Sequence, residues 1–109
     1  MDTKELGRKG EDMACTILQM RGYRILERNY RTKSGEIDII AMKDRVVVFC
    51  EVKTRIMGIF GDGREAVDQR KQMKIRKTAD VFLLNTGLSY DYCEFHVIEI
   101  TAEHLKDCF

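Results

Sequence analysis

Several features that define other protein classes are missing from this chain of 109 residues. It has no apolar run long enough to span a membrane, and its first residues, MDTKELGRKGED, do not form a signal peptide. It contains no internal repeat, low-complexity tract or linker. The formal net charge is only +1, although 34% of the residues are charged and 44% are hydrophobic. This composition is typical of a globular protein, and we expect one cytoplasmic domain covering residues 1–109.

The four cysteines also lack a recognisable pairing pattern. They are Cys15, Cys50, Cys93 and Cys108. No two of them are spaced as a C-x-x-C motif, and the first two lie in apolar segments. Neither a disulfide framework nor a zinc site is therefore expected. The thiols are predicted to be reduced, as they are in cytoplasmic proteins.

The most informative stretch is residues 35–53, which reads GEIDIIAMKDRVVVFCEVK. Its pattern predicts two β-strands joined by a two-residue turn at Asp44-Arg45. Apolar residues follow one another almost without interruption in both strands, which is typical of strands buried on both faces. We therefore predict a hairpin at the centre of a sheet.

This hairpin is expected to bring charged side chains together. With that turn, Asp38 lies opposite Glu51 and Glu36 lies opposite Lys53, all on one face because the side-chain period of a strand is two. Like charges in this position are destabilising, since their Cβ atoms are only about 5 Å apart. A divalent cation such as Mg²⁺ would turn the repulsion between Asp38 and Glu51 into coordination, with Lys53 steadying a water molecule. The alternative is an ordinary hairpin whose charged face is solvated, with a surface ion pair between Glu36 and Lys53.

A helix is predicted from Thr3 to Arg21, capped by Asp2 and ended by Gly22. Its buried stripe is predicted to contain Leu6, Gly10, Met13, Ala14, Ile17 and either Met20 or Arg21. Glu11 borders this stripe. It is either an edge glutamate that reaches solvent or a third carboxylate that approaches the metal centre from a helix laid across the sheet. Periodicity alone does not separate these interpretations.

A strand is predicted over Tyr23–Arg31, with Arg24, Arg28 and Arg31 pointing outward. Because these arginines directly precede the carboxylates, they are candidates for contacts with phosphate groups. The alternative is a solvated edge strand whose charges prevent aggregation.

A second helix is predicted from Asp62 to about Asn85, because Asp62-Gly63-Arg64-Glu65 has the pattern of a capping box. Its inward stripe is predicted to contain Ile75, Ala79, Phe82 and Leu83, and its basic face Arg70, Lys74 and Lys77. In the loop before this helix, Phe60 either stacks on a nucleic-acid base or anchors the loop to the core.

The last strand is predicted over Tyr90–Ile100. The tail that follows ends in apolar residues and is expected to pack back on the domain. The order helix, three strands, helix, strand predicts an α/β fold with a mixed sheet flanked by helices, αβββαβ.

Motifs along nearly the whole chain resemble those of the YraN family of small bacterial proteins, which have a restriction-endonuclease-like fold. They are Gly7-Arg8-Lys9-Gly10-Glu11 through Ala14, Gly22-Tyr23, Asn29-Tyr30-Arg31, Gly35-Glu36-Ile37-Asp38, Phe49-Cys50-Glu51-Val52-Lys53-Thr54-Arg55, Phe60-Gly61 and Lys71-Gln72. The same core constellation occurs in archaeal Holliday junction resolvases and other PD-(D/E)xK nucleases. One departure is the run Glu94-Phe95-His96, where relatives usually carry Arg-Phe-Asp.

The resemblance implies a nuclease-like site. Asp38 and Glu51 would bind Mg²⁺ or Mn²⁺, with the Val52 carbonyl as a further ligand. Lys53 would position or activate the attacking water, and Glu11 matches the helical glutamate that completes such sites. The residues expected to contact nucleic-acid phosphates are Arg28, Arg31, Arg55, Arg70 and Lys74.

The function expected from the sequence is therefore that of a Mg²⁺- or Mn²⁺-dependent endonuclease that hydrolyses phosphodiester bonds in DNA, including branched DNA. The first alternative is a nucleic-acid-binding module without catalysis. The second is a scaffold or interaction protein that keeps the nuclease fold and forms a homodimer through the Phe60 loop and the second helix.

Overall fold

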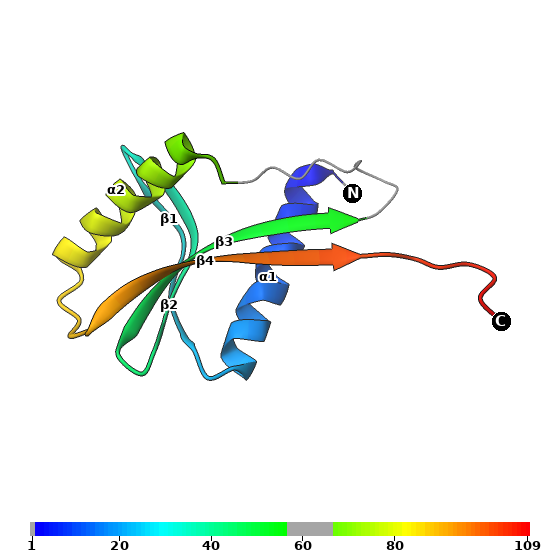
Figure 1. The fold of residues 1–109 in the computed structure, drawn as a ribbon, viewed down its shortest axis with the longest axis horizontal. Helices are drawn as coiled ribbons and strands as arrows, with labels where there is room; N and C mark the ends of the chain where they lie inside the picture. The colour runs from blue at the N-terminus through cyan, green and yellow to red at the C-terminus, as the bar shows by residue number, and fades with distance from the viewer. Residues whose placement is uncertain (1, 57–66) are drawn as a thin grey trace.

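The computed structural model describes residues 2–56 and 67–109. Figure 1 shows the order of elements along the chain. They are α1 (Thr3–Met20), β1 (Arg24–Thr32), β2 (Gly35–Lys43), β3 (Val46–Ile56), α2 (Gln69–Asn85) and β4 (Tyr92–Ala102). The predicted αβββαβ order is therefore confirmed. Neither helix in the described residues is long and apolar enough to cross a membrane.

The four strands form one mixed sheet in the order β1-β2-β3-β4. The β1–β2 and β2–β3 pairs are antiparallel, whereas β3 and β4 are parallel. The parallel pair requires a crossover, and α2 lies within this connection. The sheet consequently combines a hairpin centre with a parallel edge strand.

The predicted central hairpin has the predicted turn, and its register is as predicted over the length of the ladder. The two pairs expected beyond the ladder, Asp38 opposite Glu51 and Glu36 opposite Lys53, are not part of it. Asp44 and Arg45 both have positive φ angles, 50° and 65°, as a two-residue type I′ turn requires. From this turn the ladder runs from Lys43 opposite Val46 to Ile39 opposite Cys50. The residues beyond this last pair, Asp38 on β2 and Glu51 on β3, therefore lie at the open end of the hairpin.

The helices cover opposite faces of the sheet, which explains why both hairpin strands are continuously apolar. On one face, Ala14 and Leu18 of α1 pack with Ile39, Val48 and Cys50. The other face belongs to α2, whose Ile75, Ala79 and Phe82 pack with Ile40, Val47 and Phe49. Two cores thus meet at the same pair of strands.

Helix α1 begins where the sequence predicted, because the Asp2 carboxylate accepts a 2.8 Å hydrogen bond from the Glu5 N–H. Its buried stripe was partly wrong. Met13 and Met20 are 53% and 82% exposed. The buried residues are Leu6, Gly10, Ala14, Cys15 and Leu18. Four of them recur at every fourth position, so the helix crosses the sheet along an i, i+4 row, and this row turns both methionines toward solvent.

Helix α2 begins later than predicted. Val67 and Asp68 are not helical, and the Asp68 carboxylate accepts a 2.8 Å hydrogen bond from the Lys71 N–H as the N-cap. An aspartate in this position satisfies a backbone donor at the helix start, so it sets the boundary. The inward stripe of Ile75, Ala79, Phe82 and Leu83 was correct. The expected capping box at residues 62–65 and Phe60 lie outside the described residues.

The expectation that the C-terminal tail packs back on the domain was wrong. Residues 103–109 are exposed, including Leu105 at 68%. Figure 1 shows this segment continuing away from the body of the protein beyond β4. Because β4 extends to Ala102, the residues after it lie beyond the sheet, and their side chains are exposed in the described part of the chain.

The close approach of α1 to β3 leads to a stability prediction. A Cβ atom on Gly10 would overlap the Thr54 hydroxyl and lie 2.9 Å from the Thr54 Cβ. We expect Gly10→Ala to lower the free energy of unfolding by about 1–3 kcal/mol, because helix and strand would have to separate. Denaturant unfolding measures this change.

Gly7→Ala is the matched control in the same helix, because nothing lies within 4 Å of a Cβ atom there. It should raise the free energy of unfolding by about 0.5–1 kcal/mol through helix propensity. Equal effects at the two glycines would contradict the packing argument.

Candidate functional site

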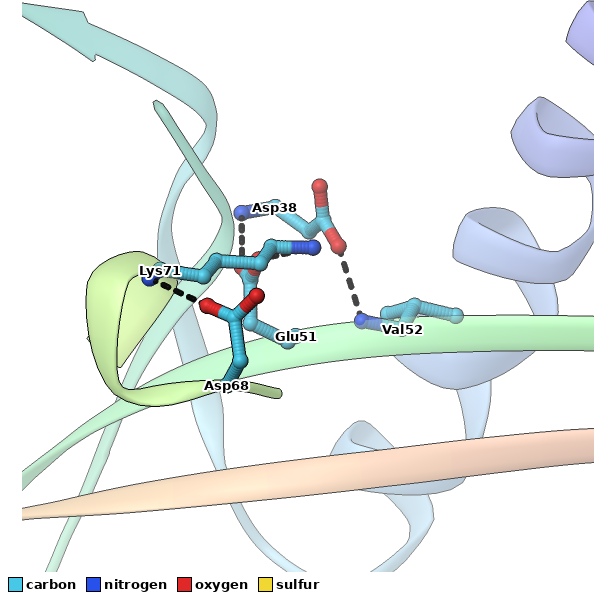
Figure 2. A network of polar contacts seen from close by, with 5 residues as sticks. All are labelled: Asp38, Glu51, Val52, Asp68 and Lys71. Atoms are coloured by element: carbon cyan, nitrogen blue, oxygen red, sulfur yellow. Dashed lines mark hydrogen bonds and ion pairs between the residues drawn. The ribbon is translucent and has the colours of Figure 1, made fainter. Parts of the chain in front are cut away.

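The candidate site lies where β2 and β3 separate. The ladder ends at the pair of Ile39 and Cys50, and Asp38 and Glu51 are the next residues toward the open end of the hairpin. There the N–H of Asp38 donates to the Glu51 carboxylate at 3.2 Å, and the N–H of Val52 donates to the Asp38 carboxylate at 2.8 Å (Figure 2). Each acidic side chain thus accepts a hydrogen bond from the other strand. The two predicted carboxylates are brought together, but through side chain–backbone bonds in place of a continued ladder.

The strand alternation breaks at Asp38. Ile37 packs with the α2 core and Ile39 with the α1 core, although residues two apart on a regular strand share a face. On the neighbouring strand Asn29 has a φ of 52°, a left-handed conformation that asparagine tolerates better than most residues. The irregularity places the Asp38 carboxylate at the opening between β2 and β3, where its oxygen reaches the Val52 N–H.

Both carboxyl groups are unusually easy to protonate. Burial raises the pKa of Glu51, the negative charge of Asp38 raises it further, and the Asp38 N–H and Lys71 oppose this. Burial also raises the pKa of Asp38, against the effects of the Val52 N–H and Lys71. Glu51 is only 6% exposed. Burial of this kind at a charged pair is typical of functional sites.

Glu11 on α1 is electrostatically coupled to this pair. Its pKa is raised by burial and then by the charge of Asp38. With the Asn29 amide group turned toward the carboxylates, it donates to Glu11 at 3.1 Å and to Glu36 at 3.2 Å. No sequence pattern predicts this bridge by Asn29, because it depends on a local backbone conformation and on the approach of α1.

The structure adds Lys71 to the predicted site. Its ammonium nitrogen lies 3.6 Å from a Glu51 carboxylate oxygen. Lys53 is half-buried on β3, and it lowers the pKa of Asp38 less than Lys71 does. The sequence contained a signal for Lys71 that the prediction did not use: it stands one helical turn before the buried Ile75, so it extends the inward stripe of α2.

A cavity of about 590 Å³ opens in front of the pair. It is lined by Gly35, Glu36, Asp38, Glu51, Asp68, Arg70, Lys71, Lys74 and Ile75. Three of these residues are cations from the first two turns of α2. The Asp38–Glu51 pair therefore forms the acidic floor of the cavity, and the cations Arg70, Lys71 and Lys74 form its basic rim.

The five predicted phosphate contacts do not form one surface. Arg70 and Lys74 line the cavity. Arg28 forms an ion pair with Asp12 at 2.7 Å, and Arg31 forms one with Glu36 at 3.4 Å. The remaining residue, Arg55, is 13% exposed and pairs with Glu99 at 2.5 Å. Only the two residues on α2 face the same space as the carboxylates.

The donor set fits a cation that needs few protein ligands. Within residues 2–56 and 67–109, no three His, Cys, Asp and Glu side chains come close enough to form a metal cage. Mg²⁺ is commonly held by one or two carboxylates together with water and substrate phosphate. Asp38 and Glu51 supply those two carboxylates. The N–H of Val52 donates to the Asp38 carboxylate, so Val52 lies beside the pair, and its carbonyl oxygen stays a predicted ligand.

The fold and this site define an α/β protein with a mixed four-stranded sheet and a carboxylate pair at the fork of its central strands. The sequence profile described as "Uncharacterised protein family UPF0102" matches residues 10–100. A UPF0102 protein from Alkaliphilus oremlandii is 48% identical over 97% of this chain and 98% of its own length. One from Moorella thermoacetica is 43% identical over 92% of this chain and 83% of its own length. The chain belongs to the UPF0102 family, the YraN family recognised from its motifs.

The raised pKa of Glu51 predicts a pH dependence of stability. The folded protein binds the Glu51 proton more tightly than the unfolded chain, whose reference pKa is 4.5. This stabilisation is complete below pH 4.5 and is lost as the pH rises through the folded pKa. Glu51→Gln is always neutral and can still accept from the Asp38 N–H. Its free energy of unfolding should therefore rise relative to wild type between pH 4.5 and 7, by about 1.4 kcal/mol for each unit of pKa shift.

Denaturant unfolding of both proteins across this pH range tests the prediction. Glu103→Gln, at an exposed position in the tail, is the control and should follow wild type at every pH. Parallel curves for wild type and Glu51→Gln would show that the folded environment leaves the Glu51 proton affinity unchanged.

Proposed function

We propose that this protein is a divalent-metal-dependent nuclease that hydrolyses phosphodiester bonds in DNA. The observation that supports this most strongly is the pair formed by the half-buried Asp38 and the buried Glu51, each of which accepts a hydrogen bond from the other's strand beside a cavity lined by cations. A pair that served stability alone would have little reason to combine burial with like charge. Its resemblance to PD-(D/E)xK nucleases points to the same chemistry.

The residues have separate roles in the proposed hydrolysis. Asp38 and Glu51 would hold Mg²⁺ or Mn²⁺, and the chemistry that such a cation supplies is activation of water and stabilisation of charge on the phosphoryl oxygens. Lys53 would orient the attacking water beside Asp38. Glu11 would approach from the α1 side, where the Asn29 amide orients its carboxylate. Each role requires a side chain that the fold has already fixed in place.

The rim of the cavity supports a polyanionic substrate. Arg70 and Lys74 stand on successive turns of α2 above the carboxylates. Two cations at this spacing can contact phosphates on either side of the bond to be cleaved. They would offset the repulsion between the acidic floor and the DNA backbone.

Substitution of the three central residues tests this function. We expect Asp38→Asn, Glu51→Gln and Lys53→Ala each to reduce Mn²⁺-dependent cleavage of labelled linear and branched DNA by roughly a hundredfold or more, while unfolding transitions stay cooperative. Removing divalent cations with EDTA should abolish cleavage by wild type. Lys106→Ala, at an exposed position in the tail, is the control and should cleave like wild type. Wild-type rates in all three variants would refute the proposal.

A second candidate function is nucleic-acid binding without catalysis. It is favoured by one observation: Arg70, Lys71 and Lys74 line the cavity, whereas no group of three or more His, Cys, Asp and Glu side chains in the described residues could hold a metal ion. Such a module would bind DNA with a strong salt dependence and no need for metal. Asp38→Asn would then leave the affinity unchanged or tighten it, and no DNA strand would be cut by any variant.

A further inference from the structure

The position of Lys71 is not explained by the roles assigned above. Its backbone is fixed, because the Asp68 carboxylate accepts the Lys71 N–H at 2.8 Å. Its side chain leaves the helix and extends over the acidic pair, as Figure 2 shows. The ammonium group ends 3.6 Å from a carboxylate oxygen of Glu51. Because the backbone is anchored and the lysine side chain is long and flexible, the ammonium group can change position while the helix stays in place.

The two partners of this ion pair differ in exposure. The Glu51 side chain is 8% exposed, whereas the Lys71 side chain is 46% exposed and lines the cavity. Glu51 is thus a buried carboxyl group, and Lys71 is a cation that borders solvent on one side and the carboxyl groups on the other. Its positive charge also favours the ionised forms of both Asp38 and Glu51.

This geometry has a consequence for cation binding. A divalent cation at Asp38 and Glu51 would compete with the Lys71 ammonium group for the Glu51 carboxylate, and the two positive charges would repel each other. This repulsion favours displacement of the ammonium group. The nearest anion-binding space open to it is the cavity, beside Arg70 and Lys74, where the proposed substrate phosphate would lie.

We propose that Lys71 is an exchangeable counter-ion. In the substrate-free protein it pairs with Glu51 and offsets part of the negative charge of the Asp38–Glu51 pair, and on cation binding its ammonium group moves to contact a phosphate oxygen of the DNA in the cavity. The inference rests on the proposed function and adds a positioning residue to it. It makes DNA binding and cation binding mutually supportive, because each favours the same displaced position of Lys71.

The proposal predicts two effects of opposite sign from one substitution. Lys71→Met keeps an unbranched side chain of similar length and removes the charge. Without its competitor, Mn²⁺ should bind about fivefold more tightly by calorimetric titration. In the presence of Mn²⁺, a short labelled DNA duplex should bind about fivefold more weakly by fluorescence anisotropy, with gels confirming that the duplex is intact.

Three matched variants on the same helix separate this role from general electrostatics. Lys71→Arg keeps the charge and should restore both affinities to near wild type. Lys74 lines the cavity, and Lys74→Met is expected to weaken DNA binding while leaving Mn²⁺ affinity unchanged. Lys77→Met, at an exposed position that is not among the described lining residues, should change neither.

The outcomes distinguish the inference from the function on which it rests. If Mn²⁺ binds in an Asp38-dependent manner but its affinity in Lys71→Met is unchanged or weaker, Lys71 is a structural ion-pair partner and the inference is wrong, although the nuclease proposal survives. If neither wild type nor Lys71→Met shows Asp38-dependent Mn²⁺ binding, with or without DNA, both proposals fail. Tighter Mn²⁺ binding without weaker DNA binding would overturn the transfer to phosphate.

Discussion

The site depends on two hydrogen bonds between β2 and β3, from the Asp38 N–H to the Glu51 carboxylate and from the Val52 N–H to the Asp38 carboxylate. Where the central hairpin opens, its strands leave backbone N–H groups without ladder partners, and an unsatisfied buried N–H costs about 1–3 kcal/mol. The N–H groups of Asp38 and Val52 are satisfied by carboxylates from the opposite strand. The backbone therefore offers each carboxylate part of the stabilisation that water would otherwise provide. The half-buried Asp38 and the buried Glu51 can lie side by side because each carboxylate accepts a hydrogen bond from the other's strand.

The two helices bring further charged side chains, one negative and one positive, to this pair. Helix α1 covers one face and carries Glu11, and α2 covers the other and carries Lys71. The sheet between them is apolar on both sides, so these side chains approach the carboxylates only where the strands separate. A local opening in an otherwise continuous core creates the cavity and determines which residues can reach it.

This arrangement gives the Asp38–Glu51 pair two possible sources of positive charge. One is internal, the Lys71 ammonium group, and the other is a cation from solution. An ion pair with a solvent-exposed partner contributes little to net stability, typically about 0–1 kcal/mol, and the Lys71 side chain is 46% exposed. The interaction between Lys71 and Glu51 is therefore better suited to exchange than to holding the fold together. The two apolar cores, which contain no such charges, supply the stability that permits this.

The elements of the fold that depend on local pattern could be predicted from the sequence. The αβββαβ order, the turn at Asp44-Arg45, the hairpin register and the Asp2 helix cap follow from periodicity and turn chemistry within a few residues. The start of α2 was missed because Asp68 is an N-cap without the usual partner three residues on, and the exposure of Met13 was missed because it depends on the crossing angle of α1.

The candidate site divides in the same way. The sequence pattern alone predicts that Asp38 and Glu51 meet at the end of the hairpin, because the turn sets which residues of the two strands lie opposite each other. Which residues surround them depends on how the helices pack on the sheet. The bridge from Asn29 to Glu11 needs a left-handed backbone and a packed helix, and the approach of Lys71 needs α2 to lie on the far face of the sheet. These contacts join segments distant in the chain, and no local pattern encodes the angle at which two packed elements meet.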